Sequence, residues 1–375
     1  MKLLFVVERN LYYKFYGPLI DEALRQKHNV YVLHNYGQPY PNAKNPKSLY
    51  FPFLNQIPQF RWGTVIPYVY REKKEVQEFI NANNLDVVLS LHPKSFYMIE
   101  DINAKWYCLQ HGQDSFLPPY RYADEGIFVY SKNWLTEKWL KENPSVNVIE
   151  CGFYHYHASD FFSPSYVRQK YGLPDKKVFL YIPLDFIQTM QLRNPIKKLY
   201  LYYIYLSETN ILKKIKQFCD KHGFHIVIKS RFKRILRKKY NRYGTVLHDE
   251  SIYPATIEEL VYIADITLSD FYYSTVVAEA IFHKSRYITV TYDYLEYDMT
   301  YAHRRYWPEA AWRDVFLPEG LNYLIKSSDF SVASLERIMN EEYDSLKREK
   351  YVRKYLLPSN QLGVSFIMDY IEQNQ

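Results

Sequence analysis

The sequence has few cysteines, few glycines and no long hydrophobic run. Its three cysteines, Cys108, Cys151 and Cys219, stand too far apart in 375 residues for a disulfide framework or a paired-cysteine zinc site. The first apolar run, residues 3–7, is too short for the core of a signal peptide, and no stretch approaches the ~20 apolar residues of a membrane-spanning helix. We therefore expect a cytoplasmic protein whose membrane contacts are peripheral, on the inner face.

Several sequence signatures are also missing. With only 11 glycines, the chain has neither a Walker A loop nor a Gly-x-Gly-x-x-Gly fingerprint, which counts against an ATPase and a Rossmann dehydrogenase. Its His, Asp and Cys residues show no metal-ligand spacing, so we expect no metal ion and no cofactor. The formal charge of +7 favours anionic partners, but no nucleic-acid module accompanies it, so nucleic acid is not an expected partner.

The chain is rich in apolar and aromatic residues, and short apolar runs alternate with segments of helical spacing. Apolar residues make up 47% of it and aromatic residues 18%, which is enough for a large core, and the length predicts two domains at ~150 residues each. Short apolar runs alternate with stretches such as 16–30, where Leu19, Ile20, Ala23 and Leu24 have helical spacing. This alternation predicts parallel sheets covered on both faces, with functional loops at the carboxyl ends of the strands.

The alternation is interrupted once. Residues 153–176 are rich in aromatic residues, histidine and proline, and predict a linker before a second α/β series. We therefore predict an α/β protein of two Rossmann-like domains that face each other across a ligand-binding cleft. The predicted domains span 1–152 and 153–360, and a final helix in 361–375 is expected to pack back on the first domain.

The sharpest local signal lies in residues 264–290, where a strand is followed by a helix. The strand is predicted to end near Asp270, Ser274 and Thr275 stand at the start of the helix, and Glu279 lies one turn further in. Free N–H groups at a helix N-terminus suit a pyrophosphate, the two hydroxyls can add hydrogen bonds, and Glu279 can accept from ribose hydroxyls. The alternative is that Ser274 only caps the helix.

This segment resembles the donor-binding element of GT-B nucleotide-dependent transferases, especially the CDP-glycerol glycerophosphotransferases of teichoic-acid synthesis. It is more loosely similar to UDP-N-acetylglucosamine 2-epimerases. Further segments resemble the glycerophosphotransferase pattern in the same order, so that the resemblance extends over about 105–375; they are 151–162, 167–186, 290–298 and 362–372. The resemblance implies a GT-B fold whose second domain binds a CDP- or UDP-linked donor and whose first domain binds an acceptor hydroxyl.

The resemblance also implies a catalytic base in the segment LQHGQDS. His111 follows a predicted strand and precedes Gly112, and the family carries a His-Gly here whose histidine is the base. An ordinary pKa near ~6.5 suits a histidine to this role, although a histidine at a strand end can also be structural. Glu8 and His92, at other strand ends of the first domain, are candidates for acceptor binding.

A basic segment follows the predicted strand 224–230. The family usually has a basic residue and then a reactive histidine here, whereas this chain has Lys229, Ser230 and Arg231. Lys229 and Arg231 are candidates for pairing with the donor diphosphate. Residues 229–242 hold eight basic residues and no acidic one, interleaved with apolar residues, which suits an anionic membrane surface or simply a solvated helix face.

Together these features predict a transferase. It would move a glycosyl or glycerophosphate unit from a nucleotide-diphosphate donor to a hydroxyl of a cell-envelope or capsular glycan, or of a lipid-linked acceptor. One alternative is an enzyme like the UDP-sugar 2-epimerases, which leaves the basic segment unexplained. Another is a catalytically silent protein that binds a nucleotide or a glycan.

Overall fold

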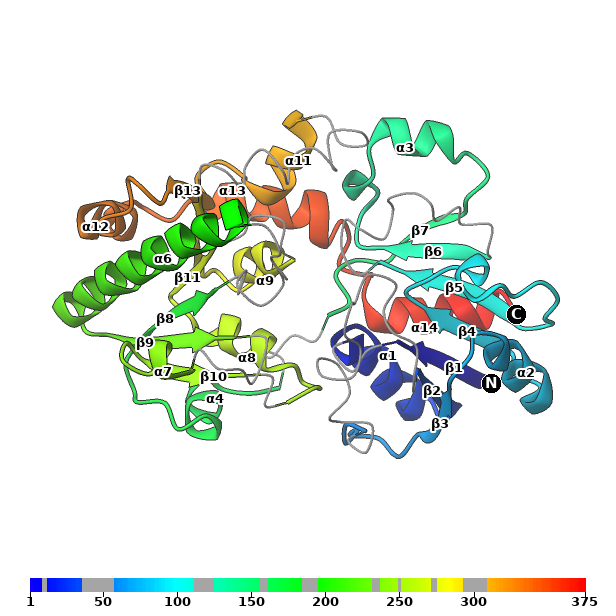
Figure 1. The fold of residues 1–375 in the computed structure, drawn as a ribbon. Helices are drawn as coiled ribbons and strands as arrows, with labels where there is room; N and C mark the ends of the chain where they lie inside the picture. Colours follow the sequence, from blue (N-terminus) through cyan, green and yellow to red (C-terminus); the bar gives the residue numbers. More distant parts are fainter. Residues whose placement is uncertain are drawn as a thin grey trace. The chain divides into compact units, whose positions relative to one another are not determined.

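The chain forms two compact units in a computed structural model, drawn in Figure 1. The first unit comprises Met1–Tyr156, Ser251–Ala255 and Val352–Gln375, and the second comprises His157–Glu250 and Thr256–Tyr351. The structure describes residues 1–8, 12–35, 57–110, 125–155, 161–183, 195–230, 237–248, 251–270, 275–292 and 309–375, without the side chains of 195–205, 237–238 and 309–311.

The first unit is built on a seven-stranded parallel sheet of order β3-β2-β1-β4-β5-β6-β7. Its strands are β1 (Lys2–Val7), β2 (Asn29–Asn35), β3 (Ile66–Tyr70), β4 (Val87–Ser90), β5 (Lys105–Leu109), β6 (Gly126–Val129) and β7 (Val148–Glu150). The helices are α1 (Tyr13–Arg25), α2 (Lys74–Asn83), α3 (Glu137–Glu142) and α14 (Val364–Gln373), with short η2 (Lys94–Tyr97), η4 (Lys132–Trp134) and η6 (Val352–Leu356).

The second unit is built on a six-stranded parallel sheet of order β10-β9-β8-β11-β12-β13. Its strands are β8 (Lys177–Ile182), β9 (Phe224–Lys229), β10 (Thr245–Leu247), β11 (Ile266–Ser269), β12 (Arg286–Thr291) and β13 (Asn322–Lys326). The helices are α4 (Pro164–Lys170), α6 (Pro195–His222), α7 (Arg237–Tyr240), α8 (Thr256–Ile263), α9 (Val276–Phe282), α11 (Glu309–Phe316), α12 (Val332–Asn340) and α13 (Ser345–Tyr351).

The two sheets confirm the predicted fold class, an α/β protein with two Rossmann-like halves. Strand β1 is a continuous apolar run whose residues 3–7 are all buried, as expected for a parallel strand covered on both faces. Helix α1 buries Leu19, Ile20 and Ala23, the positions whose spacing predicted it. None of the helices in the described part of the chain, the 28-residue α6 included, is long and apolar enough to cross a membrane.

Two segments contain an element that the pattern of apolar residues alone did not predict. The region read as a linker contains α4, which begins at Pro164 behind Ser163, whose hydroxyl oxygen accepts from the Tyr166 N–H at 3.2 Å. Strand β3 was not predicted, because it lies at the edge of the first sheet and its apolar residues Ile66 and Val69 are exposed. A strand with one buried face shows alternating apolar and polar residues, and β3 has no such buried face.

The end of the chain belongs to the first unit. Helix α14 packs against α1, where the Ser365 hydroxyl donates to Glu22 Oε1 at 3.1 Å. The residue before α14 also contacts the first unit, because the Gly363 N–H donates to the Cys151 carbonyl at 2.7 Å. The last residues of the sequence are therefore part of the first unit, although the second unit precedes them in the chain.

Candidate functional site

In the second unit, predicted donor residues lie at the carboxyl edge of the sheet. Strand β8 pairs with β9 on one side and β11 on the other, so the ends of all three strands meet at one edge. Lys229 ends β9 and Asp270 directly follows β11, and both side chains are buried. The Lys229 ammonium donates to the carbonyl of Ser230 at 3.3 Å. A cation and a carboxylate thus lie on either side of the end of β8, at the edge where parallel sheets bind ligands.

Helix α9 adds Glu279 to this edge. The side chain of Glu279 is buried, and Thr275 precedes the helix in a right-handed helical conformation without making a capping hydrogen bond. Tyr287 of β12 contacts the end of β11, because its hydroxyl lies 2.6 Å from the Ser269 hydroxyl. Burial raises the pKa of Tyr287; the hydrogen bond with Ser269 opposes this shift, and the Glu279 and Asp270 carboxylates add to it.

A cluster that the sequence did not reveal includes Asp270; we call it the carboxylate–tyrosine cluster. It comprises Tyr181 of β8, Glu208 of α6, Lys239 and Tyr240 of α7, and Asp270. The Tyr181 hydroxyl donates to Asp270 Oδ2 at 2.8 Å, and the Tyr240 hydroxyl donates to Glu208 Oε1 at 2.6 Å. Lys239 forms an ion pair with Glu208, in which both side chains are 8% exposed. This part of the basic segment is therefore buried in the protein.

Three of the predicted site residues, His111, Arg231 and Ser274, lie outside the described residues. The chain is described up to Gln110, which is fully buried directly after β5 and whose side-chain oxygen accepts from the Tyr130 N–H at 2.8 Å. His111 follows this residue in the sequence. Its role as a base stays a prediction.

In the first unit, Glu8 and His92 lie at the ends of neighbouring strands. Glu8 follows β1 and His92 follows β4, the two strands pair directly, and both side chains are buried. The His92 ring stacks on the Phe96 ring with ring centroids 4.3 Å apart. The Lys73 ammonium lies 3.8 Å from the centre of the Phe96 ring. Burial lowers the pKa of Lys73, and the Glu8 carboxylate opposes that shift. Glu8, Lys73 and His92 thus form one polar group at the carboxyl edge.

Tyr16 joins the two strands that carry these residues. Its hydroxyl donates to the Val6 carbonyl at 2.8 Å and accepts from the Leu91 N–H at 2.9 Å. Burial, and to a smaller extent the Glu8 carboxylate, raises the pKa of Tyr16, which keeps the hydroxyl protonated. The spacing between the ends of β1 and β4 is therefore fixed by a buried hydrogen bond on each side.

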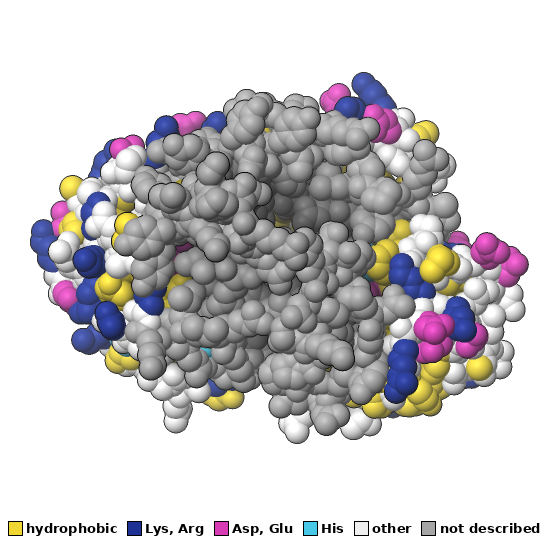
Figure 2. Space-filling view, in the orientation of Figure 1, with side chains coloured by type: hydrophobic (Ala, Val, Ile, Leu, Met, Phe, Trp, Pro, Cys, Tyr) yellow, Lys and Arg dark blue, Asp and Glu magenta, His cyan; other side chains and the backbone are white. Residues whose placement is uncertain are grey.

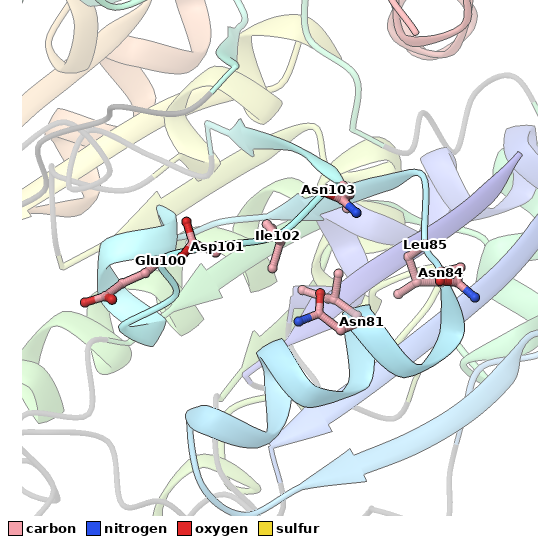
Figure 3. A pocket seen from close by; sticks show the side chains of 9 residues that line it. Asn81, Asn84, Leu85, Glu100, Asp101, Ile102 and Asn103 are labelled. Atoms are coloured by element: carbon pink, nitrogen blue, oxygen red, sulfur yellow. The ribbon is translucent and has the colours of Figure 1, made fainter.

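A hollow of about 360 Å³ lies elsewhere in the first unit, as Figure 3 shows. It is lined by Ile80, Asn81, Asn84, Leu85 and residues 100–104. These residues belong to the end of α2, the start of the chain leading into β4 and the loop before β5. The hollow is therefore at the amino ends of these strands, whereas Glu8 and His92 are at the carboxyl ends.

Comparison with known proteins gives the fold. No family model matches the chain, and no curated protein matches it. A protein from Listeria monocytogenes described as a UDP-N-acetylglucosamine 2-epimerase is similar with a TM-score of 0.58 and 10% identity, over 100% of this chain and 96% of the other. CalG4, the calicheamicin glycosyltransferase, has a TM-score of 0.53 and 11% identity, over 99% and 97% of the chains.

A third similar structure is the glycotransferase of kitacinnamycin, with a TM-score of 0.54 and 10% identity over 99% of this chain and 98% of the other. At these identities the likeness concerns the fold alone. The GT-B-like architecture of two parallel Rossmann-like sheets, which was predicted from the sequence, is thereby confirmed.

Proposed function

We propose that the protein is a GT-B-type transferase that uses a CDP- or UDP-linked donor. It would move a glycosyl or glycerophosphate unit to a hydroxyl of a glycan or of a lipid-linked acceptor in the cell envelope. The observation that carries this proposal is the gathering of Lys229, Asp270 and Glu279 at the carboxyl edge of the second sheet, where open parallel sheets bind their ligands.

Two kinds of side chain would bind different parts of the donor. The carboxylates of Asp270 and Glu279 are acceptors, so they suit the hydroxyls of a ribose or of the transferred unit. Lys229 and Arg231, with the hydroxyls of Ser274 and Thr275, suit the diphosphate, whose negative charge grows as the nucleotide leaves. This division uses each side chain for the partner that its charge favours.

The acceptor would bind in the first unit. Glu8 and His92 are held at adjacent strand ends, and Lys73, which the sequence did not indicate, adds a cation beside them. His111 would remove the proton from the acceptor hydroxyl, since β5, the strand before it, lies next to β4. The transfer then needs no group beyond the side chains of the protein.

A nucleotide panel tests the proposal. Thermal unfolding would be followed with CDP, UDP, CDP-glycerol and UDP-sugars, with ADP, GDP and the free nucleosides as controls. We expect a cytidine or uridine diphosphate compound to raise the unfolding temperature, because a ligand that binds only the folded state stabilises it. A panel in which no nucleotide raises it would contradict the proposal.

The second candidate function is that of a sugar-nucleotide epimerase, because residues 264–290 are also loosely similar in sequence to UDP-N-acetylglucosamine 2-epimerases. The two functions differ in their products. A transferase releases nucleotide at a rate that depends on added acceptor, whereas an epimerase acts without one. Nucleotide binding without turnover for any acceptor would instead favour a silent binding protein.

The basic segment, residues 229–242, supports a peripheral contact with an anionic membrane. Figure 2 shows further Lys and Arg side chains, among Asp and Glu, on the surface where Figure 1 draws α6 and α12. Lys229 and Lys239 do not take part in this contact, because both side chains are buried and Lys239 is paired with Glu208. The contact would therefore use other cations of the segment, such as Arg237 and Lys238.

Vesicle sedimentation tests this contact. We expect binding to anionic but not to neutral vesicles at low salt. Reversing Arg237 and Lys238 to glutamate should weaken it at least tenfold, since each basic side chain near the surface contributes about 1 kcal/mol. Reversing Lys176 and Lys213, exposed lysines of the same unit, is the matched control and should have a smaller effect. Equal losses in the two double variants would contradict a specific role for the segment.

A further inference from the structure

The carboxylate–tyrosine cluster offers more hydrogen-bond acceptors than donors around one hydroxyl. Tyr181 has a single proton, and two carboxylates lie near it: Asp270 Oδ2 at 2.8 Å and Glu208 Oε1 at 3.5 Å. Glu208 is already occupied, because Oε1 accepts from Tyr240 at 2.6 Å and Oε2 pairs with Lys239. The proton of Tyr181 is therefore directed to Asp270.

Tyr181 is suited to hold this position over a wide pH range. Its side chain is fully buried. Burial raises the pKa of Tyr181 well above its ordinary value, and the Asp270 and Glu208 carboxylates raise it further, so the hydroxyl keeps its proton. A protonated, buried hydroxyl is a fixed donor that sets the orientation of the carboxylate it contacts.

We propose that Tyr181 is a positioning residue of the donor site that acts through Asp270, with Glu208 directing its proton. By holding Oδ2, Tyr181 keeps the Asp270 carboxylate in the orientation in which it accepts from a hydroxyl of the donor. The inference rests on the proposed function and makes it more specific: Asp270 recognises the hydroxyl-bearing part of a nucleotide donor, since a carboxylate repels phosphate.

The chain offers a matched control for the loss of such a hydrogen bond. In the same unit, the buried carboxylate of Glu259 accepts from Lys170 at 2.7 Å and also from the Tyr171 hydroxyl. This is the same combination of lysine, tyrosine and glutamate as in the cluster, and it shares no residue with it. Tyr171→Phe therefore removes a partly buried tyrosine–carboxylate hydrogen bond without touching Asp270.

The experiment measures nucleotide and pyrophosphate affinities by calorimetry in the full chain. The nucleotide is the nucleoside diphosphate, CDP or UDP, that binds more tightly to the wild type, and the variants are Tyr181→Phe, Asp270→Asn, their combination and Tyr171→Phe. We expect Tyr181→Phe to weaken the nucleotide about five- to thirtyfold, as for a lost hydrogen bond to a charged group. Pyrophosphate affinity should stay within about twofold, because pyrophosphate has no ribose hydroxyl to offer Asp270.

The combined variant separates positioning from a general structural effect. If Tyr181 acts through Asp270, the double variant binds the nucleotide no more weakly than Asp270→Asn alone, whereas independent effects would multiply. Tyr171→Phe should leave nucleotide affinity within about twofold, although it also removes a tyrosine–carboxylate hydrogen bond of the same unit.

Three outcomes would overturn the inference. Nucleotide affinity in Tyr181→Phe equal to that in Tyr171→Phe would do so, and so would effects of Tyr181→Phe and Asp270→Asn that multiply. In both cases the wild type still binds nucleotide, and the proposed function stands. A wild type that binds neither CDP nor UDP would overturn the inference together with the proposed function.

Discussion

Replacing His111 by alanine is expected to lower turnover about a hundred- to ten-thousandfold, the usual loss on removing a general base. Nucleotide affinity should change by no more than about twofold. The reason for the separation is that His111 belongs to the first unit, whereas the proposed donor residues belong to the second. Nucleotide release in the presence of acceptor gives the rate, and calorimetry gives the affinity.

The matched control for this variant is His28→Ala. His28 belongs to the same unit but lies just before β2, at the opposite edge of the sheet, where its ring contacts Gln26 and Glu372. Its removal should leave turnover unchanged. A folded His111→Ala protein that turns over within about threefold of the wild type would show that the base lies elsewhere, and Glu8 and His92 would be tested next.

Replacing Lys170 by methionine is expected to destabilise the second unit by about 3 kcal/mol. The side chain of Glu259 is 0% exposed, and Lys170 supplies its counter-charge. Without the lysine, the buried Glu259 carboxylate keeps the hydrogen bond from the Tyr171 hydroxyl but loses its counter-charge. The expected cost lies at the lower end for buried ion pairs because the Lys170 side chain is 29% exposed and water reaches it.

Hydrogen exchange in α4 and α8 measures this loss within the second unit alone. The control is Lys176→Met, an exposed lysine near the same helix, whose replacement should change stability by no more than about 0.5 kcal/mol. Similar exchange rates in the two variants would mean that the Lys170–Glu259 pair contributes little to the stability of this unit.

Strands and helices with a buried face were predictable from the sequence. Strand β1 and helix α1 have apolar residues at the spacing that burial requires, and both form where expected. Strand β3 was missed because its exposed apolar residues carry no such pattern. The periodic spacing of apolar residues indicates burial, so it does not predict an exposed strand at the edge of a sheet.

The candidate site was predictable only where it lies close to strand ends. The positions of Asp270 and Lys229 were predictable because a residue at the end of a buried strand of a parallel sheet must lie at its carboxyl edge. Tyr181 and Glu208 were missed as site residues, since Glu208 meets Tyr181, and Tyr181 meets Asp270, only through tertiary packing. Lys239 counted toward a solvent-facing basic run and is instead paired inside the protein.

The central claim, that the second unit binds a nucleoside diphosphate through Glu279, is tested most directly by titrating CDP and UDP into the wild type and Glu279→Ala. We expect the wild type to bind one of them and the variant to bind it about 1–3 kcal/mol more weakly, the cost of a lost hydrogen bond to a charged group. Glu336→Ala, which removes an acidic side chain on α12 paired with Lys221, should bind as the wild type does. Equal affinities of the wild type and Glu279→Ala for CDP and for UDP, or binding of neither, would contradict the claim.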